Sequence, residues 1–247
     1  MYLLNQAPER GAAFEIVCCL TSERTFDEEV RVERRGIPVR VHPMEDWYAA
    51  AGMQSCRDLE LREAYDARTL AMIEPYLPDV VLLDGYLFLV TPPMLRRFRH
   101  RVLNLHFADL TLRTIGGGPR FPGIRAVRQA LAAGERETRA TVHLVDAFAD
   151  NGPLVVRSRP FPVSPLVEEL RTTGAESVFK AYAFAHEQWM MCTAAGQLIA
   201  AALRLVSNGA VDLDALAGGV ERDAPWELDR HGFLMAPREA AAGAGAR

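Results

Sequence analysis

The sequence has few cysteines, and their spacing excludes the sites that cysteines usually build. Four occur in 247 residues, and no two of them form a C-x-x-C pair or another spacing of zinc ligands. A disulfide framework and a structural zinc centre are therefore not expected. We expect reduced, mostly buried thiols in a cytoplasmic protein that holds no metal. The four residues are Cys18, Cys19, Cys56 and Cys192.

The sequence also lacks a strong charge of either sign and a long apolar run. Its net charge of −4 at pH 7 predicts no basic surface for nucleic acid. The longest apolar stretch, residues 194–206, is too short for a membrane span and contains Gln197 and Arg204. The first residues become polar too early for a signal peptide. We therefore expect neither nucleic acid nor a membrane among the partners.

What the sequence does contain is an alternation of strand-like and helix-like segments. Its residues are 49% hydrophobic, which is enough for a sizeable core. Continuous apolar strands that alternate with helices predict an α/β fold with a doubly wound, mostly parallel sheet and helices on both faces. The expected strands are residues 14–22, 37–42, 79–88, 101–106, 140–146 and 153–163, and the expected helices are 58–77, 92–100 and 123–134.

The C-terminal third has a different pattern. Residues 166–207 are expected to be helical, and the chain after them to be irregular. We find no linker of distinct composition, so we predict one α/β domain over residues 1–165 with a helical extension, 166–247, packed on it. The small, flexible residues of the tail, 239–247, predict disorder.

The strand at residues 102–106, VLNLH, places two polar side chains in an apolar run. Asn104 and His106 are two residues apart, so both lie on one face of an extended chain. Ligands of open α/β sheets bind at the carboxyl ends of the strands, where His106 lies. Asp150 opens a D-N-G-P turn between two later strands, and this turn would return it to the same edge. The three side chains are therefore expected to converge.

An asparagine, a histidine and a carboxylate suit acyl transfer without a covalent intermediate. An amide N–H and an imidazolium can both donate to a developing oxyanion, and a carboxylate can hold the charge of the histidine or accept a proton through water. No activated serine or cysteine lies nearby in the sequence, so a nucleophilic triad has little support. A structural interpretation stays open, with Asn104 and His106 as satisfied polar groups and Asp150 as a turn residue.

Two segments carry a resemblance to a known family. LNLHFADL and GIRAVRQALAAGERETRATVHLVDAFADNGPLVVRSRPFPV together resemble the folate-dependent formyltransferase superfamily, over about residues 14–165. The family pattern is Asn-x-His after a strand, a helix that ends in Gly-Glu, then Thr-Val-His and Asp-x-Gly-Pro. The resemblance implies a Rossmann-like fold and 10-formyltetrahydrofolate as the formyl donor.

The resemblance also implies roles for particular residues. Asn104, His106 and Asp150 match the catalytic positions of the family, and His143 matches a histidine beside the site. A structural role for His143 stays open. The segment GYLFLV resembles the one that holds the pterin of the donor, although plain core packing would explain it equally well. Its cofactor-binding candidates are Tyr86, Leu87, Phe88, Leu89 and Val90.

The chain departs from the family pattern at its start. Family members begin with a strand and a Gly-Ser-rich loop that binds phosphate at a helix N-terminus. This chain begins with MYLLNQAPERG, which resembles the helix that follows that loop. After His106 it reads HFADLTL, without the two prolines of the family's His-Pro-Ser-Leu-Leu-Pro. The identity of the acceptor is therefore open.

Two functional hypotheses follow. The first is an N-formyltransferase that moves a formyl group from 10-formyltetrahydrofolate to an amine of a small molecule, with His106 acting as an imidazolium. The second is a folate-binding pseudoenzyme that has lost the phosphate loop. The transfer-RNA branch of the family carries a β-rich C-terminal domain, and the helical C-terminal third does not fit it. A homodimer stays an open alternative.

Overall fold

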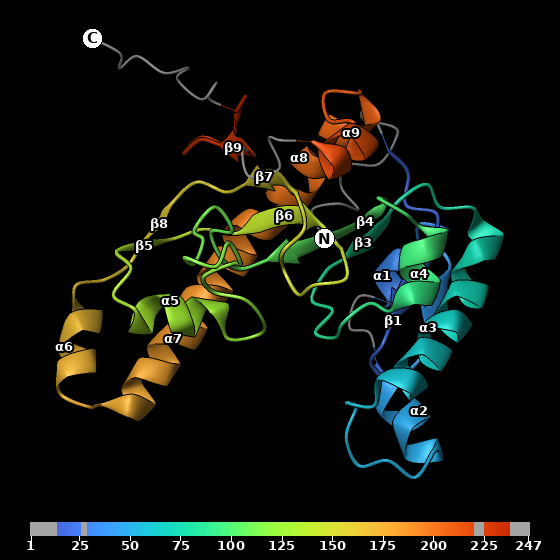
Figure 1. The fold of residues 1–247 in the computed structure, drawn as a ribbon, viewed down its shortest axis with the longest axis horizontal. Helices are drawn as coiled ribbons and strands as arrows, with labels where there is room; N and C mark the ends of the chain where they lie inside the picture. The colour runs from blue at the N-terminus through green and yellow to red at the C-terminus, as the bar shows by residue number, and fades with distance from the viewer. Residues whose placement is uncertain (1–13, 26–28, 220–224, 238–247) are drawn as a thin grey trace.

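The computed structural model describes residues 14–25, 29–219 and 225–237 (Figure 1). Within these residues a six-stranded sheet has the order β10-β9-β7-β6-β4-β3. Its strands are β3 (Val81–Leu83), β4 (Val102–His106), β6 (Thr141–Leu144), β7 (Leu154–Arg157), β9 (Trp226–Leu228) and β10 (Leu234–Met235). Two smaller sheets pair β1 (Cys19–Thr21) with β2 (Val39–Val41), and β5 (Glu137–Thr138) with β8 (Phe161–Pro162).

Four of the six strands in the central sheet point in one direction. β3 is parallel to β4 and β7 is parallel to β9, while β6 is antiparallel to both β4 and β7. The link between β6 and β7 is too short for the crossover that a parallel pair needs, which explains the direction of β6. The predicted fold class, a Rossmann-like, mostly parallel sheet with helices on both faces, is confirmed.

The β1–β2 sheet shares its core with the central sheet. Within the described part of the chain, β1 pairs only with β2. The side chains of Cys18 and Leu20 nevertheless pack in the same apolar cluster as Val81 and Leu83 of β3. The two sheets are therefore joined by packing of side chains rather than by a continuous hydrogen-bonded ladder.

The helices form two groups beside the sheet. Figure 1 shows α1 to α4 next to β1 and β3, and α5 to α8 along the rest of the sheet. Residues 74–76 add a 3₁₀ turn and residues 191–195 a π-helical segment. The helices are α1 (Glu29–Glu33), α2 (Met44–Ala50), α3 (Leu59–Ile73), α4 (Pro92–Arg97), α5 (Ala126–Ala132), α6 (Leu166–Thr172), α7 (Glu176–Met190), α8 (Gly196–Ser207) and α9 (Leu213–Gly218).

Local signals in the sequence explain several helix ends. The side chain of Asp58 accepts a hydrogen bond from the backbone N–H of Leu61 at 2.8 Å, which caps α3. Pro92 occupies the first turn of α4, where its missing N–H costs nothing. Gly134 has φ +82°, and this left-handed conformation ends α5.

The main core lies between the central sheet and the C-terminal helices. Leu198 and Ile199 of α8 are almost fully buried and share one apolar cluster with Val142 of β6 and Val156 of β7. The joined helix of residues 176–207 is long and apolar enough to cross a membrane by length and composition alone. Half of its most apolar window is buried within the protein, so one such helix is only weak evidence for a membrane span.

Some predicted segments differ from the observed elements. β3 ends at Leu83, and Gly85, with φ +70°, turns the rest of the expected strand into an irregular segment. The chain after residue 207 is not irregular, because it contributes α9, β9 and β10, and β9 joins the central sheet beside β7. The interpretation of residues 1–11 as a helix and the predicted disorder of 239–247 concern residues outside the described ranges.

The cysteines are free, as expected, but their predicted burial is wrong. Cys192 is exposed, and Cys18, Cys19 and Cys56 are only half-buried. Cys18 and Cys19 lie where β1 begins, in a sheet of only two described strands, so neither face is fully covered. For both thiols, burial nevertheless raises the pKa.

Candidate active site

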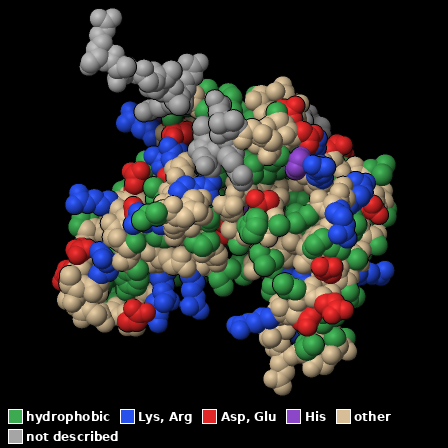
Figure 2. Space-filling view, in the orientation of Figure 1, with side chains coloured by type: hydrophobic (Ala, Val, Ile, Leu, Met, Phe, Trp, Pro, Cys, Tyr) green, Lys and Arg blue, Asp and Glu red, His purple; other side chains and the backbone are tan. Residues whose placement is uncertain are grey.

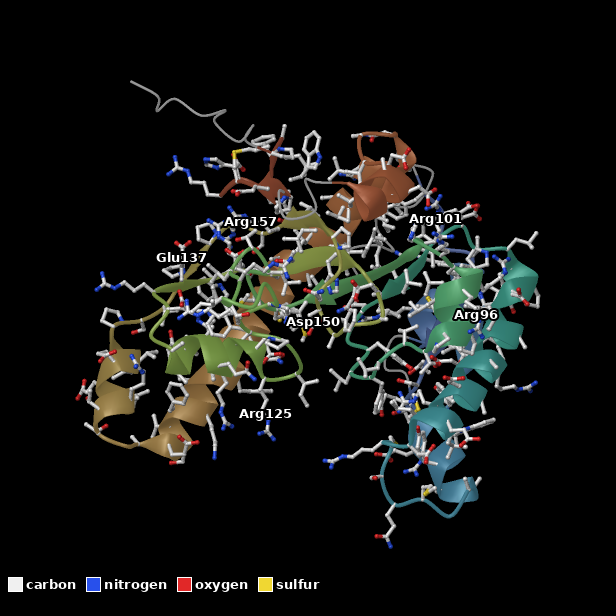
Figure 3. All side chains as sticks on the ribbon, viewed as in Figure 1. Arg96, Arg101, Arg125, Glu137, Asp150 and Arg157 are labelled. Carbon is white, nitrogen blue, oxygen red and sulfur yellow. The ribbon has the colours of Figure 1, made fainter. Side chains whose placement is uncertain are left out.

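A cavity of about 220 Å³ opens at the carboxyl ends of β3 and β4. Figure 3 shows Asp150 in the middle of the molecule, between the two groups of helices, and Figure 2 shows hydrophobic side chains gathered on the surface there. The cavity brings together all the residues that the sequence analysis assigned to the site. They are Asn104, His106, Asp150, His143, Tyr86, Leu87, Phe88, Leu89 and Val90.

Strand register places Asn104 beside His143. The two residues are direct partners in the antiparallel pair of β4 and β6, so their side chains lie on the same face of the sheet. Nδ2 of Asn104 lies 3.2 Å from Nε2 of His143. Nδ1 of His143 is 2.7 Å from the carbonyl oxygen of Leu144, which can only accept, so Nδ1 carries the hydrogen. In the neutral ring Nε2 then accepts a hydrogen bond from Asn104.

The turn after β6 carries Asp150 back to this edge. Asp150 has φ +53°, a left-handed conformation that asparagine and aspartate tolerate better than other side chains. Its Oδ2 accepts the backbone N–H of Gly123 at 2.7 Å, and its Oδ1 lies 3.5 Å from Nδ2 of Asn104. Gly152 closes the turn so tightly that a Cβ there would lie 1.8 Å from the carbonyl oxygen of Leu144. The predicted turn residues thus position the carboxylate.

His106 is held between a carbonyl group and the carboxylate. Nε2 donates to the carbonyl oxygen of Phe121 at 3.0 Å, and Nδ1 lies 3.4 Å from Oδ1 of Asp150. Burial lowers the pKa of His106 below its usual 6.5, although Asp150 and the Phe121 carbonyl oppose this shift. The resting ring is therefore neutral at pH 7, with its lone pair on Nδ1. Burial disfavours the charged form of the resting ring, so the expected imidazolium would form only when His106 accepts a proton, and this role stays a prediction.

Asp150 stays ionised. Burial raises its pKa, but the neighbouring imidazoles of His143 and His106, when they are charged, and the N–H of Gly123 together lower the pKa of Asp150 to about 2. The site therefore pairs a carboxylate with a neutral, unprotonated Nδ1. A proton delivered to His106 would be stabilised at once by the carboxylate beside it.

In the segment after β3, some side chains are exposed at the cavity and others are packed against α2 and α3. Leu87 and Leu89 are more than half exposed at the cavity. Tyr86 and Phe88 instead pack against an apolar cluster that contains Tyr48 of α2. The side chains of Leu87 and Leu89 are therefore available to a ligand, whereas those of Tyr86 and Phe88 anchor the segment.

Two cavity-lining residues, from α7 and its continuation, were not predicted from the sequence. Glu187 and Met191 line the cavity from this helix and its π-helical continuation. Burial raises the pKa of Glu187. No local signal in the sequence identifies these residues, because α7 reads as an apolar core helix and meets the site only through tertiary packing. The described residues contain no group of three His, Cys, Asp or Glu side chains that could hold a metal ion.

Comparisons with known proteins agree with this geometry. The family model described as formyl transferase matches residues 2–185. Phosphoribosylglycinamide formyltransferase of Mycobacterium tuberculosis strain H37Rv is 41% identical over 102 residues, which are 41% of this chain and 43% of that protein. The trifunctional purine biosynthetic protein adenosine-3 of Drosophila pseudoobscura pseudoobscura is 29% identical over 199 residues, 81% of this chain and 12% of that protein. The matches thus span less than half the length of these relatives.

Solved structures show the same fold. Glycinamide ribonucleotide transformylase 1 of Symbiobacterium toebii superimposes with a TM-score of 0.58 and 26% identity, over 84% of this chain and 81% of that one. Formyl transferases of this family use 10-formyltetrahydrofolate as the formyl donor. Because the family model covers well over half of the chain, the protein belongs to the formyl transferase family.

Proposed function

We propose that this protein transfers the formyl group of 10-formyltetrahydrofolate to an amine of a small molecule. One observation carries the proposal: Asn104 and His106 both lie within 3.5 Å of the Asp150 carboxylate in the cavity of a formyl transferase family member. Polar groups that converge in an apolar cavity, with shifted pKa values for His106 and Asp150, are typical of an active site.

The proposed reaction begins when the amine attacks the formyl carbon. The formyl oxygen then becomes an oxyanion, and Nδ2 of Asn104, whose 3.5 Å contact to Asp150 is weak, donates to it. The attacking nitrogen loses a proton to the neutral Nδ1 of His106, directly or through water, and Asp150 stabilises the imidazolium 3.4 Å away. The oxyanion then re-forms the carbonyl and breaks the bond from the formyl carbon to N10. N10 takes up the proton held by His106, which yields the formylated amine and tetrahydrofolate and returns His106 to its neutral form.

The acceptor is the less defined part of the proposal. The relatives named phosphoribosylglycinamide formyltransferase make a phosphorylated glycinamide the first acceptor to test. Within the described residues that line the cavity there is no lysine or arginine to pair with a phosphate. Figure 3 shows Arg96, Arg101 and Arg157 away from Asp150. An unphosphorylated primary amine is therefore the second acceptor to test. Because Glu187 lines the cavity, we propose that its side chain contacts the acceptor.

The alternative, a folate-binding protein without catalysis, is not favoured. Three polar side chains that meet at the cavity support chemistry rather than binding alone. The proposal further places the protein in the cytoplasm, without nucleic acid or membrane partners. A homodimer stays a prediction, which light scattering coupled to gel filtration would test.

Donor binding can be tested without catalysis. Leu87 is 64% exposed at the cavity, so Leu87→Asp should leave folding intact and abolish binding of a non-reactive 10-formyltetrahydrofolate analogue in calorimetry. Leu59→Asp is the matched control, because Leu59 is 60% exposed in the first turn of α3 and does not line the cavity. Folded wild-type protein that does not bind the analogue at about millimolar concentration would contradict the proposal.

A further inference from the structure

Two residues of α3 contact the segment of residues 85–91, whose residues 85–90 line the cavity. Asp66 and Arg62 lie one helical turn apart, so their side chains project from the same face of the helix. Both are only 2% exposed. Neither lines the cavity, and neither is among the residues assigned to the site above.

Asp66 fixes the C-terminal end of the segment. Its Oδ2 accepts the backbone N–H of Thr91 at 2.7 Å and the Thr91 hydroxyl at 2.6 Å. Burial raises the pKa of Asp66, while the two hydrogen bonds from Thr91 and the charge of Arg62 lower it. Thr91 is also the residue before Pro92, where α4 begins. One carboxylate therefore fixes both the end of the segment and the start of the next helix.

Arg62 fixes the middle of the segment. Its guanidinium carbon lies 4.5 Å from the centre of the Phe88 ring, a distance at which a cation attracts an aromatic face. The group is tied down by hydrogen bonds from Nη2 to the carbonyl of Cys56 at 2.9 Å and from Nε to the hydroxyl of Tyr48 at 3.3 Å. Its buried Nη1 has no hydrogen-bond partner. The charge is thus satisfied in part by aromatic faces, which makes the Phe88 contact stronger than at an exposed site.

These contacts determine which side chains reach the cavity. Phe88 packs against α3, and Leu87 and Leu89 on either side of it are left more than half exposed at the cavity. We propose that Asp66 and Arg62 are positioning residues for the formyl donor, which hold residues 85–91 in the conformation that binds the folate. This inference rests on the proposed function, since the segment is the donor side of the proposed site.

The test compares Asp66→Asn with Asp58→Asn, the same change at the cap of the same helix, where asparagine caps as well as aspartate. Asp66→Asn should weaken binding of the non-reactive donor analogue about tenfold, because it replaces a charged acceptor of two hydrogen bonds. The KM for the donor should rise by a similar factor, and the KM for the amine should not change. Phe88→Leu keeps an apolar side chain but removes the ring that contacts Arg62. This variant should also weaken binding of the donor analogue.

Amide hydrogen exchange gives a readout that does not depend on folate. Asp66→Asn should speed exchange in a peptide that covers residues 85–91, whereas Asp58→Asn should leave it at the wild-type rate. Equal exchange and equal analogue affinity in the two variants would overturn the inference, as would a parallel rise of both KM values. If wild-type protein binds no analogue, the proposed function fails, while the exchange comparison still decides whether Asp66 holds the segment.

Discussion

Asp150 shows how single residues create the proposed site. A left-handed conformation at a residue other than glycine costs about 1 to 3 kcal/mol when the surroundings impose it. Here the N–H of Gly123, which donates to Oδ2 at 2.7 Å, helps to offset that cost, and Oδ1 lies 3.4 Å from His106 and 3.6 Å from His143. The strained conformation is thus used to aim one carboxylate at both imidazoles.

Alanine replacement of the three polar residues should separate catalysis from folding. Asn104→Ala, His106→Ala and Asp150→Ala should each slow formyl transfer by at least about a hundredfold, as expected for oxyanion donors and general acid–base groups. Because His106 and Asp150 act as a unit in the proposed proton transfer, the double variant should cost far less than the sum of the single effects. Rates of tetrahydrofolate release, measured beside thermal melts, test this. Additive losses would mean that the two residues act separately.

Glu187 should matter to the acceptor and not to the donor. Its carboxylate lines the cavity from α7, and burial raises its pKa, so it gains from a hydrogen-bond or charge partner on the acceptor. Glu187→Gln should raise the KM for the amine and leave the KM for the donor unchanged. Glu176→Gln, an exposed acid at the start of the same helix, is the control. A rise in the donor KM alone would mean that Glu187 contacts the donor and not the acceptor, which would contradict the prediction.

The sequence predicts some residues of this site and misses others for a physical reason. Asn104, His106 and Asp150 could be found because local rules apply to them, namely strand alternation and turn chemistry. Glu187 could not, because it reaches the cavity only when α7 packs across the sheet. The neutral state of His106 was also out of reach, since its pKa depends on burial and on the Phe121 carbonyl.

At the scale of elements, the turn between β6 and β7 places the carboxylate. Gly152→Ala should therefore impair activity and stability together, because the new Cβ would lie 1.8 Å from a backbone oxygen that cannot move aside. Gly36→Ala is the control, since that glycine has φ +74° but open space around it, and its replacement should cost only about 1 kcal/mol. Denaturant melts of both variants test this. A Gly152→Ala protein as stable as Gly36→Ala would show that the turn adapts.

Elements with clear periodicity were predicted well, whereas two short strands near the C-terminal end of the described chain were not. The helix of residues 59–73 and the strand of residues 102–106 have clear periodicity and fall within their predicted ranges. β9 and β10 contain three and two residues, which is too short for any periodic pattern, and β9 is defined by its pairing with β7. The segment after β3 reads as a strand, but Gly85 and the contacts to α3 override that preference.

At the scale of the whole molecule, three buried histidines link stability to pH. Burial is the first cause that lowers the pKa of His42, His106 and His186 below 6.5. Below that pH the unfolded chain binds more protons than the folded one, so stability should fall from about pH 7 to about pH 5. Asp150, with its pKa lowered from 3.8 to about 2, should add a further loss only below about pH 4.

Urea denaturation across this range checks the prediction. His186→Gln should reduce the slope of stability against pH, because one of the three titrating groups is removed. Stability that is flat or rising as the pH falls from about 7 to about 5 would contradict the assignment of these histidines as neutral in the folded state.

The most direct test of the central claim is formyl transfer itself. Purified full-length protein is incubated with 10-formyltetrahydrofolate and either phosphoribosylglycinamide or an unphosphorylated primary amine, and tetrahydrofolate release and the formylated product are both measured. We predict stoichiometric product with at least one acceptor, and a rate at least about a hundredfold lower for His106→Ala at an unchanged melting temperature. Folded wild-type protein that binds the donor analogue, yet formylates neither acceptor and melts well above all three alanine variants, would contradict it and make the polar residues structural.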